Sequence, residues 1–502
     1  MNQKPVNLID AAAVILLDNT GKVLWARRNP HLAFLGGWHA FPGGKLETSD
    51  AHVKVVNCAD AELERFIACA VREAFEEVGV LLVRNGDKLT RGQRASLHDD
   101  LISGRMTFAE ILAHWNLHVD ARDFVYTGFW TTPQFSPVRF KTRFFLVACP
   151  PKQQPYAAIS ELENVEFIRP PEAIEKWKRS EVLISPPVLL SLKTLADNLI
   201  ANESKTVAEN LLENSQTADG QIRYIELNSR VICFPLKTET LPPATHTNCF
   251  IVGRKKFVVI DAASKDEPEQ NALHSLVDSL VEKNFVCLAI ITTHLHQDHF
   301  GGEAVLQTHL REKFNLEVPV AAHKLTAESL AGAVSIQKFI EDADVFNLED
   351  ADGGKFDLKT LHTPGHARGL LAFYDEEFGF LLTGDNVVGS GSVVIAPPEG
   401  NMKIYLESLE RMKNLPNLRF LCGSHGAAVS DAKGKIEDYI AHRLEREKQV
   451  LEAFQYGAKT AREIAEKVYV GLNPELLKLA EKSAEAHLEK LQDEKLTADE
   501  RR

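Results

Sequence analysis

The segment "ITTHLHQDHFGG", residues 291–302, places three histidines and one aspartate within six positions at the end of an apolar run. A backbone that leaves a buried strand has no structural need for so many imidazoles. His294 and His296 lie two positions apart, so both rings can face one centre, while Asp298 and His299 can face a neighbouring centre. Imidazole nitrogen combined with carboxylate oxygen is a ligand set that zinc and similar cations favour. The segment therefore predicts a metal site.

Two metal ions need more than four ligands, and the sequence offers three more at the ends of later apolar runs. His366 follows "FDLKTLHT", Asp385 follows "GFLLTG" and His425 follows "LRFLCG". A further residue, Asp261, ends the run "KFVVID" and suits a carboxylate that orients a histidine ligand. Because the three ligands each follow an apolar segment and lie beside glycine, we expect them to converge at one edge of a sheet.

These motifs occur in order between residues 223 and 432, and this region resembles the metallo-β-lactamase fold superfamily. The resemblance implies an αββα sandwich and two Zn²⁺ ions, or other transition-metal ions, that activate water for hydrolysis. It places His294, His296 and His366 on one metal, Asp298, His299 and His425 on the other, and Asp385 between them. Asp298 is also expected to act in catalysis. A chance cluster of satisfied histidines is the alternative, and the five ordered motifs count against it.

A second acidic motif, "REAFEEVGV", spans residues 72–80. Glu73, Glu76 and Glu77 are spaced i, i+3 and i+4, so a helix places all three carboxylates on one face. Their charges repel one another, and a hard cation such as Mg²⁺ or Mn²⁺ would neutralise them while binding a diphosphate. Gly79 suits the end of this helix, and the turn "FPGG" can pack tightly against it. The alternative is an acidic helix face exposed to solvent.

This motif resembles the second half of the Nudix box, which implies an αβα Nudix fold over residues 1–200. Glu73, Glu76 and Glu77 would bind the metal, Glu76 and Glu77 would act in catalysis, and Arg72 would hold the loop and helix together. An insertion, "TSDAHVKVVNCADAELERFIAC", separates "FPGG" from Arg72, as in the coenzyme A diphosphatase-like branch related to Nudix motif 19. Two assignments stay open: the acidic residue of the first half-box, Glu47 or Asp50, and the general base, with Glu161, Glu163 and Glu166 as candidates.

Length and composition limit the other classes of protein. The chain has 502 residues, and a prior of roughly 150 residues per domain suggests about three domains. The net charge of −13 argues against a general surface for binding polyanions. The seven cysteines form no CxxC pair and mostly lie in apolar runs, which favours reduced thiols in the cytoplasm. No apolar run approaches the roughly 20 residues that span a bilayer, so we expect no membrane association.

The fold class expected from these signals is α/β and multidomain. The predicted order is a Nudix domain over residues 1–200, a polar linker over 201–222, a metallo-β-lactamase-fold domain over 223–432, and a helical, winged-helix-like lobe over 433–502. In this lobe, Thr460 and Glu463 form a capping box that predicts the start of a helix. The alternative for the lobe is a solvated helical bundle that closes the preceding domain.

Two hydrolytic sites on one chain suggest related small-molecule substrates. The Nudix site would cleave a nucleoside-diphosphate-linked compound of the coenzyme A type, and the dinuclear zinc site would hydrolyse a thioester or another ester. The sequence leaves the oligomeric state open.

The second domain also resembles the β-lactamase-like protein 2 group, in which some members are endoribonucleases selective for single-stranded RNA. The alternative function is therefore an endoribonuclease with a nucleotide-sensing Nudix domain. Such an enzyme needs a basic strip that leads to the metal site. The candidates Arg443, Arg446 and Lys448 are interleaved with Glu445 and Glu447, a mixture more typical of a solvated helix.

Overall fold

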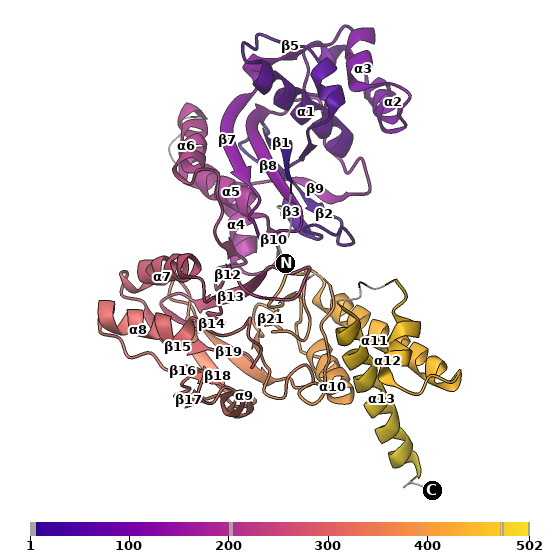
Figure 1. Cartoon of the computed structure of the whole chain (residues 1–502). Helices are drawn as coiled ribbons and strands as arrows, with labels where there is room; N and C mark the ends of the chain where they lie inside the picture. Colours follow the sequence, from indigo (N-terminus) through magenta and orange to yellow (C-terminus); the bar gives the residue numbers. More distant parts are fainter. Residues whose placement is uncertain (1–6, 200–203, 390, 472, 474–475, 500–502) are drawn as a thin grey trace. The chain divides into compact units, whose positions relative to one another are not determined.

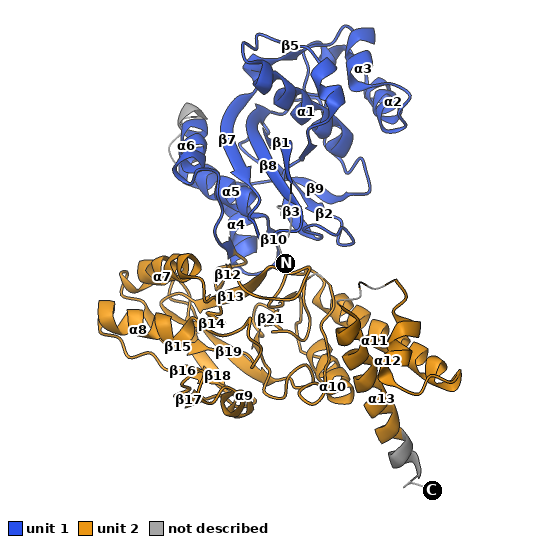
Figure 2. Cartoon of the chain, in the orientation of Figure 1, with its two compact units in different colours: residues 1–225 blue, residues 226–502 orange. Residues whose placement is uncertain are grey.

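The computed structural model describes residues 7–199, 204–389, 391–471, 473 and 476–499. The chain divides into two compact units, residues 1–225 and 226–502 (Figures 1 and 2). Each unit contains its own sheet and its own hydrophobic core. Across the described residues, none of the helices is both long and apolar enough to cross a membrane.

The first unit is built on a mixed sheet with the strand order β10-β3-β2-β1-β8-β7, in which β4 pairs with β1 and β9 with β2. The central strands β1 and β8 run parallel along their whole length. The strand bounds are β1 (Leu8–Leu17), β2 (Val23–Arg28), β3 (Trp38–Ala40), β4 (Gly43–Lys45), β7 (Val125–Thr131), β8 (Arg139–Ala148), β9 (Leu162–Ile168) and β10 (Leu183–Ile184). A separate pair joins β5 (Val55–Val56) to β6 (Val119–Asp120).

Helices cover both faces of this sheet, because β1 is apolar on both sides. Val14 and Leu16 pack into the core that contains α1, whereas Ala13 and Ile15 pack with α4 and α5. This alternation follows the two-residue period of a strand. The helices are α1 (Ala61–Val78), α2 (Arg91–Ile102), α3 (Phe108–His114), α4 (Pro170–Lys178), α5 (Pro186–Leu199) and α6 (Ser204–Thr217), with the 3-10 segments η1 (Thr48–His52), η2 (Gly86–Lys88) and η3 (Ala121–Asp123). The αβα layering predicted for this region is confirmed.

Helix α6 lies in the stretch predicted as a polar linker, residues 201–222, of which 201–203 fall outside the described residues. Its Ser215 hydroxyl accepts a hydrogen bond from the Phe129 N–H and donates one to the Phe129 carbonyl. These contacts lie where the register of β7 is irregular, between Tyr126 and Phe129. A side chain at Gly128 would collide with Ser215, so glycine is needed at this position. The linker prediction is therefore wrong for α6, which packs on the sheet of the first unit. The polar composition suggested a linker because only one side of this helix is buried, and the other side carries polar residues.

The second unit contains strands in the order β11-β12-β13-β14-β18-β19-β20-β21-β22, and β14 also pairs with β15, which continues to β16 and β17. Most neighbours in the main path are antiparallel, whereas β14, β15 and β16 run parallel to one another. The bounds are β11 (Ile225–Glu226), β12 (Val231–Lys237), β13 (His246–Gly253), β14 (Lys256–Ile260), β15 (Val286–Ile291), β16 (Val320–Ala322), β17 (Lys338–Phe339), β18 (Val345–Glu349), β19 (Lys355–His362), β20 (Leu371–Asp375), β21 (Phe380–Leu382) and β22 (Phe420–Cys422).

Two helical layers enclose these strands and produce the predicted αββα sandwich. Helices α7 (Glu267–Val281) and α8 (Glu303–Phe314) share a core with β12 to β15. Helix α10 (Met402–Lys413) and the first half of α11 (Ala432–Gln455) share another with β20 to β22. Figure 1 shows these two pairs of helices on opposite sides of the strands, with the short α9 (Lys324–Ser329) near β17.

The C-terminal lobe consists of helices in the described part of the chain. α12 (Ala461–Val468) begins with the predicted capping box between Thr460 and Glu463, and α13 (Leu477–Asp499) follows. Helix α11 contributes to two cores, because Tyr439 packs with α10 whereas Val450 packs with α12 and α13. One continuous helix therefore joins the sandwich to the lobe.

Candidate metal centres

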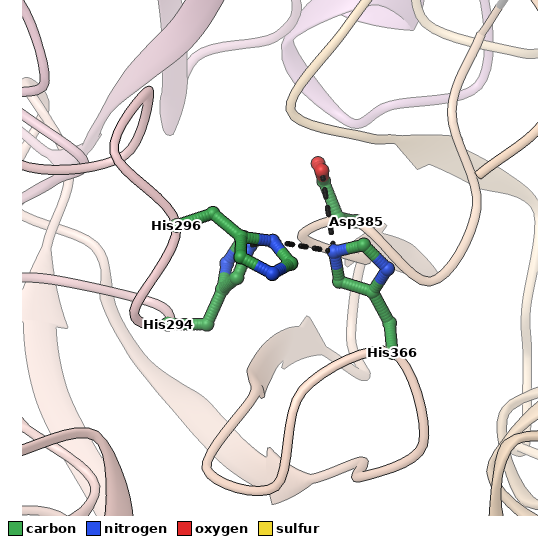
Figure 3. A group of neighbouring side chains, drawn as sticks. All are labelled: His294, His296, His366 and Asp385. Atoms are coloured by element: carbon green, nitrogen blue, oxygen red, sulfur yellow. Dashed lines mark hydrogen bonds and ion pairs between the residues drawn. The ribbon is translucent and has the colours of Figure 1, made fainter. Parts of the chain in front are cut away.

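The structure brings the seven predicted ligands of the second unit together. They lie in four loops that each begin beyond a strand end: His294, His296, Asp298 and His299 after β15, His366 after β19, Asp385 after β21, and His425 after β22. Two groups result, and within each group the donor atoms lie within 4.8 Å of one another. The first metal group contains His294, His296, His366 and Asp385 (Figure 3), and the second contains Asp298, His299 and His425.

Asp385 lies between the two groups. Its Oδ2 atom is 3.6 Å from His366 Nε2 in the first group and 3.5 Å from His299 Nε2 in the second. Its Oδ1 atom is 3.5 Å from His425 Nε2. This position suits a carboxylate that bridges two cations.

The nitrogen that each ring presents to the centre is defined by its neighbours. His296 Nδ1 lies 2.9 Å from His294 Nε2 and also 2.9 Å from His366 Nε2. The three rings and Asp385 point toward one another in Figure 3. His296 therefore faces the centre through Nδ1, whereas His294 and His366 face it through Nε2.

The opposite ring nitrogens are held from behind. His366 Nδ1 donates to the Val394 carbonyl and His425 Nδ1 to the His246 carbonyl, both over 2.9 Å. His299 Nδ1 lies 2.9 Å from a carboxylate oxygen of Asp261. Such contacts fix the tautomer, so the Nε2 lone pair is free to bind a cation.

Asp261 occupies the orienting position that the sequence suggests. Its carboxylate accepts 2.8 Å hydrogen bonds from the backbone N–H and from the hydroxyl of Thr293, in addition to its contact with His299. The residue is fully buried and has a φ of +56°. One carboxylate thus fixes both the start of the histidine loop and one of its rings.

Sequence reasoning missed Glu303, which holds the histidine loop at both ends. Its carboxylate accepts from the Thr292 hydroxyl over 2.9 Å and from the Gly301 N–H over 2.7 Å. Burial raises the pKa of Glu303 to about 7. The available signal was an acidic residue directly after two glycines at the start of a helix.

The donor chemistry fits cations at both groups. His299 Nε2 and Asp385 Oδ1 are buried and have no hydrogen-bond partner among the described residues. Burial lowers the pKa of His366 to about 4 and that of His294 as well, so these rings are neutral ligands near pH 7. Burial opposes protonation of His425 too, but the charge of Asp385 and the bond to Asp298 raise its pKa to about 10. A divalent cation can replace that proton as the partner of the carboxylates.

In the first unit, the acidic residues of the second motif lie on one face of α1. Glu73 and Glu77 are buried, with 8% and 5% of their surface exposed, and Glu76 is less buried. Glu77 Oε2 accepts a 2.8 Å hydrogen bond from the Gly43 N–H. A side chain at Gly44 would come within 2.5 Å of the Glu73 carboxylate. The glycine turn therefore packs directly on these carboxylates, and Gly79 ends the helix with a φ of +67°.

Arg72 joins this helix to the chain before the insertion, at Lys45, and to the start of the insertion, at Asp50. Its guanidinium donates to both oxygens of Asp50, over 2.7 and 3.0 Å, and to the Lys45 carbonyl over 3.1 Å. Asp50 is fully buried, whereas Glu47 is exposed at the start of η1. Of the two open candidates, Asp50 is thus the partner of Arg72.

The charge of this site also fits a cation. Arg72 donates to Glu73 over 2.8 Å and to Glu76 over 3.2 Å, so one guanidinium serves three carboxylates and leaves Glu77 without a cationic partner in this set. Burial raises the pKa of Glu73 to about 7 and that of Glu77 to about 8. The three glutamates do not form a group of donor atoms within 4.8 Å among the described residues, unlike the histidine groups.

The three candidates for the general base have different surroundings. Glu163 lies 3.8 Å from Arg27, and Glu166 accepts a hydrogen bond from Trp25 Nε1. The negative charge of Glu161 contributes to the raised pKa of Glu77, after burial and the charge of Glu73. Glu161 is therefore the candidate that interacts with the acidic site.

Four family models match parts of the chain. Residues 242–425 match the metallo-beta-lactamase superfamily, and residues 460–502 match the beta-lactamase associated winged helix domain. Residues 7–101 match the NUDIX domain, and residues 58–195 match the NUDT19 Nudix domain. The family resemblances drawn from the sequence are confirmed by these matches.

Named relatives match between two fifths and one half of the chain. "Lactamase-like protein adaB" of Aspergillus niger is 32% identical over 42% of this chain and 59% of its own length. "Atrochrysone carboxyl ACP thioesterase dmxR1" of Cryptosporiopsis sp. is 31% identical over 42% of this chain and 58% of its own length. "Beta-lactamase-like protein 2 homolog" of Drosophila melanogaster is 27% identical over 49% of this chain and 82% of its own length. The chain therefore matches less than two thirds of the length of the Aspergillus niger and Cryptosporiopsis proteins.

Solved structures are similar to each half. A beta-lactamase domain protein from Burkholderia ambifaria is 19% identical, with a TM-score of 0.47, over 54% of this chain and 87% of its own. A NUDIX hydrolase from Alicyclobacillus acidocaldarius is 26% identical, with a TM-score of 0.35, over 39% of this chain and 93% of its own.

Proposed function

We propose that this chain, which joins a Nudix domain to a metallo-β-lactamase domain, is a hydrolase with two independent metal-dependent sites. The second site would hydrolyse an acyl thioester, and the first would cleave the diphosphate of a coenzyme A-type compound. The observation that carries the proposal is the convergence of seven donor side chains from four loops, in which His299 Nε2 and Asp385 Oδ1 are buried without a hydrogen-bond partner among the described residues.

In the second unit, two divalent cations would supply an activated water and neutralise charge on the substrate oxygen. His294, His296 and His366 would hold one cation, Asp298, His299 and His425 the other, and Asp385 would contact both. The Asp298 side chain is 16% exposed, and one of its oxygens lies 3.4 Å from His425 Nε2. Its carboxylate would accept the proton that the attacking water loses.

A thioester is the favoured substrate class for this site. Three relatives named atrochrysone carboxyl ACP thioesterase share 28–32% identity with this chain over 41–50% of its length. Thioesters of acyl carrier protein and of coenzyme A present the same phosphopantetheine thiol to an enzyme. The first unit resembles coenzyme A diphosphatases, which act on the diphosphate of coenzyme A. An acyl-coenzyme A therefore contains one bond for each site, a thioester and a diphosphate.

In the first unit, Mg²⁺ or Mn²⁺ would supply positive charge to a diphosphate. Glu73, Glu76 and Glu77 would hold the cation on one face of α1, and the hydrogen bond from Gly43 N–H would keep Glu77 aimed at it. Arg72 and Asp50 would hold the glycine turn against the helix. Glu161, whose charge acts on Glu77, would be the residue that takes a proton from the attacking water.

The test is incubation of the full-length protein with acyl-coenzyme A, Mg²⁺ and Zn²⁺, followed by separation of the products. Thioester hydrolysis consumes water and yields a free acid and coenzyme A, and diphosphate hydrolysis yields 3′,5′-ADP and a phosphopantetheine. We expect His294→Ala to abolish only release of the acid and Glu77→Gln to abolish only release of 3′,5′-ADP. Neither product from the wild-type protein would refute the proposal.

A nucleotide-sensing role for the first unit predicts a different result. Glu76→Gln and Glu77→Gln would then change only the dependence of thioester hydrolysis on added nucleotide, with no 3′,5′-ADP formed by any variant.

The ribonuclease alternative finds no basic strip on α11. Arg443 is buried and donates to the Val393 carbonyl, and Arg446 donates to Gln449. Lys448 is exposed but stands between Glu447 and Gln449. Because binding to RNA depends on accessible cations, thioester hydrolysis is the better-supported activity. Cleavage of single-stranded RNA that is lost in His294→Ala would reverse this preference.

A further inference from the structure

The segment between Asp385 and Ile395 contacts the metal groups at three places. Asp385 itself begins it. The Gly389 N–H donates a 2.8 Å hydrogen bond to the carbonyl of His425. The Val394 carbonyl accepts the 2.9 Å bond from His366 Nδ1. We call the described residues 386–389 and 391–395 the support loop, because one ligand precedes it and two others bond to its backbone.

Two side chains of α11 hold the support loop from behind. The Tyr439 hydroxyl donates to the Gly391 carbonyl over 3.0 Å, and it lies 3.2 Å from the Val388 N–H and 3.3 Å from the Val388 carbonyl. One helical turn later, Arg443 Nη2 donates to the Val393 carbonyl over 2.5 Å and to the Ser392 hydroxyl over 2.9 Å. The two side chains therefore hold the loop along most of its length.

These contacts are buried, so water cannot readily replace them. Arg443 is 3% exposed and Tyr439 is 6% exposed. The guanidinium of Arg443 also lies over the ring of Tyr405, whose hydroxyl donates to the Asn386 carbonyl over 2.6 Å. Burying a charge is costly unless hydrogen bonds compensate, and the oxygens of the support loop provide part of this compensation at Nη2, whereas Nε has no hydrogen-bond partner among the described residues. The loop and the arginine are thus each stabilised by the other.

We propose that Arg443 and Tyr439 are positioning residues for the metal centre, through which the C-terminal helix α11 sets the geometry of His366 and His425. The proposal rests on the metal-dependent function proposed above. Val393 and Val394 are consecutive, so the carbonyl fixed by Arg443 and the carbonyl that orients His366 belong to adjacent peptide groups. Without Arg443 these peptide groups can rotate, and His366 loses the acceptor that keeps its proton on Nδ1.

Helix α11 packs in two different hydrophobic cores, one in the sandwich and one in the C-terminal lobe. The part of α11 that carries Tyr439 packs in the core of the sandwich, whereas the part that carries Val450 packs in the core of the C-terminal lobe. One continuous helix therefore contacts both the C-terminal lobe and the support loop of the metal centre.

The test compares full-length Arg443→Met, Arg443→Lys and Tyr439→Phe with Arg446→Met as the matched control. Arg446 lies three residues further along α11, where it contacts the ring of Tyr469 and donates to Gln449 and to the Val468 carbonyl rather than to the described residues of the support loop. The measurements are the dissociation constants for two equivalents of Co²⁺ and the visible absorption spectrum of the Co²⁺ protein, which reports ligand geometry. Thermal unfolding of the metal-free proteins serves as a check of folding.

We expect Arg443→Met to weaken binding of at least one equivalent about tenfold and to change the spectrum, as loss of an outer partner of a ligand does. Arg443→Lys should recover part of the affinity because an ammonium can still reach one carbonyl. Tyr439→Phe keeps the ring in the core and should give a smaller change in the same direction, which keeps the test valid if Arg443→Met does not fold. Arg446→Met should match the wild type.

Wild-type affinities and spectra in both Arg443→Met and Tyr439→Phe would overturn the proposal. So would a change of the same size in Arg446→Met, because it would assign the effect to general loosening of the lobe. If the wild-type protein itself took up no Co²⁺, the proposed metal-dependent function would fail instead.

Discussion

Replacement of Asp261 by asparagine tests how far the second metal group depends on the carboxylate behind it. Asp261 accepts hydrogen bonds from the N–H and hydroxyl of Thr293 and contacts His299 Nδ1. Asparagine has the same shape and tolerates the φ of +56° better than other non-glycine residues. The fold should therefore survive this substitution, whereas alanine would leave several buried donors unpaired.

The expected loss follows from the tautomer of one ring. The asparagine can still accept from the Thr293 N–H, but its NH₂ group then faces His299 Nδ1. The imidazole must accept at Nδ1 and carry its proton on Nε2, which is the atom that faces the second metal group. Loss of such a partner lowers metal affinity by about 10- to 100-fold, which corresponds to about 1.4–2.7 kcal/mol.

Competition between the metal-free protein and a chromophoric chelator measures Zn²⁺ affinity for each equivalent. We expect Asp261→Asn to weaken one equivalent within that range and to change the other less, because Asp261 contacts the ring of His299 directly but reaches the first metal group through the Thr293 hydroxyl, 3.0 Å from His294 Nδ1. Asp266→Asn is the matched control, since the Asp266 side chain does not cap α7. Two equivalents bound with wild-type affinity in Asp261→Asn would show that this carboxylate does not orient a ligand.

Three further substitutions have defined outcomes. Gly44→Ala should lower Mg²⁺ affinity at the first unit at least about tenfold by titration calorimetry, because its Cβ would displace the Glu73 carboxylate, 2.5 Å away. Glu77→Gln should raise the melting temperature of the metal-free protein at pH 9 and leave it unchanged at pH 4. Burial raises the pKa of Glu77 from 4.5 to about 8, so the ionised carboxylate destabilises the fold increasingly as the pH rises across that interval, and glutamine removes this effect. Arg230→Met should lower the free energy of unfolding of the second unit by about 3–5 kcal/mol in urea, since it leaves the buried Asp375 carboxylate, 2.9 Å away, without its main partner.

The features that the sequence predicts well are those set by short spacings. The carboxylates of α1 share a face because three residues fall at i, i+3 and i+4, and the helix ends at Gly79 because that residue adopts a left-handed conformation. The metal ligands follow apolar runs, and strands that end in one region of a sheet bring such residues together. His294 and His366 meet in this way although 72 positions separate them.

The features that escape prediction depend on which partner a side chain meets after folding. Asp50 and Glu47 are equally acidic and only three positions apart, but the start of η1 turns Asp50 inward to Arg72 and leaves Glu47 in solvent. Arg443 looks like one charge among many on a polar helix, yet it is buried against the support loop. Local spacing does not predict that Asp50 and Arg443 are buried, because the burial of each depends on a segment elsewhere in the chain.

The donor groups of the two kinds of site differ in how strongly they bind protons when no metal is present, and this difference favours a different cation at each site. At the first unit, Glu73 and Glu77 have pKa values raised to about 7 and about 8, so a cation competes with protons that are already weakly held near neutral pH. At the second metal group the proton on His425 is held with a pKa of about 10, because Asp385 and Asp298 surround it. Displacing that proton at pH 7 requires a cation with a strong preference for imidazole. We therefore propose Mg²⁺ for the first unit, since it binds oxygen and gives up its water reluctantly, and Zn²⁺ for the second, since it favours imidazole.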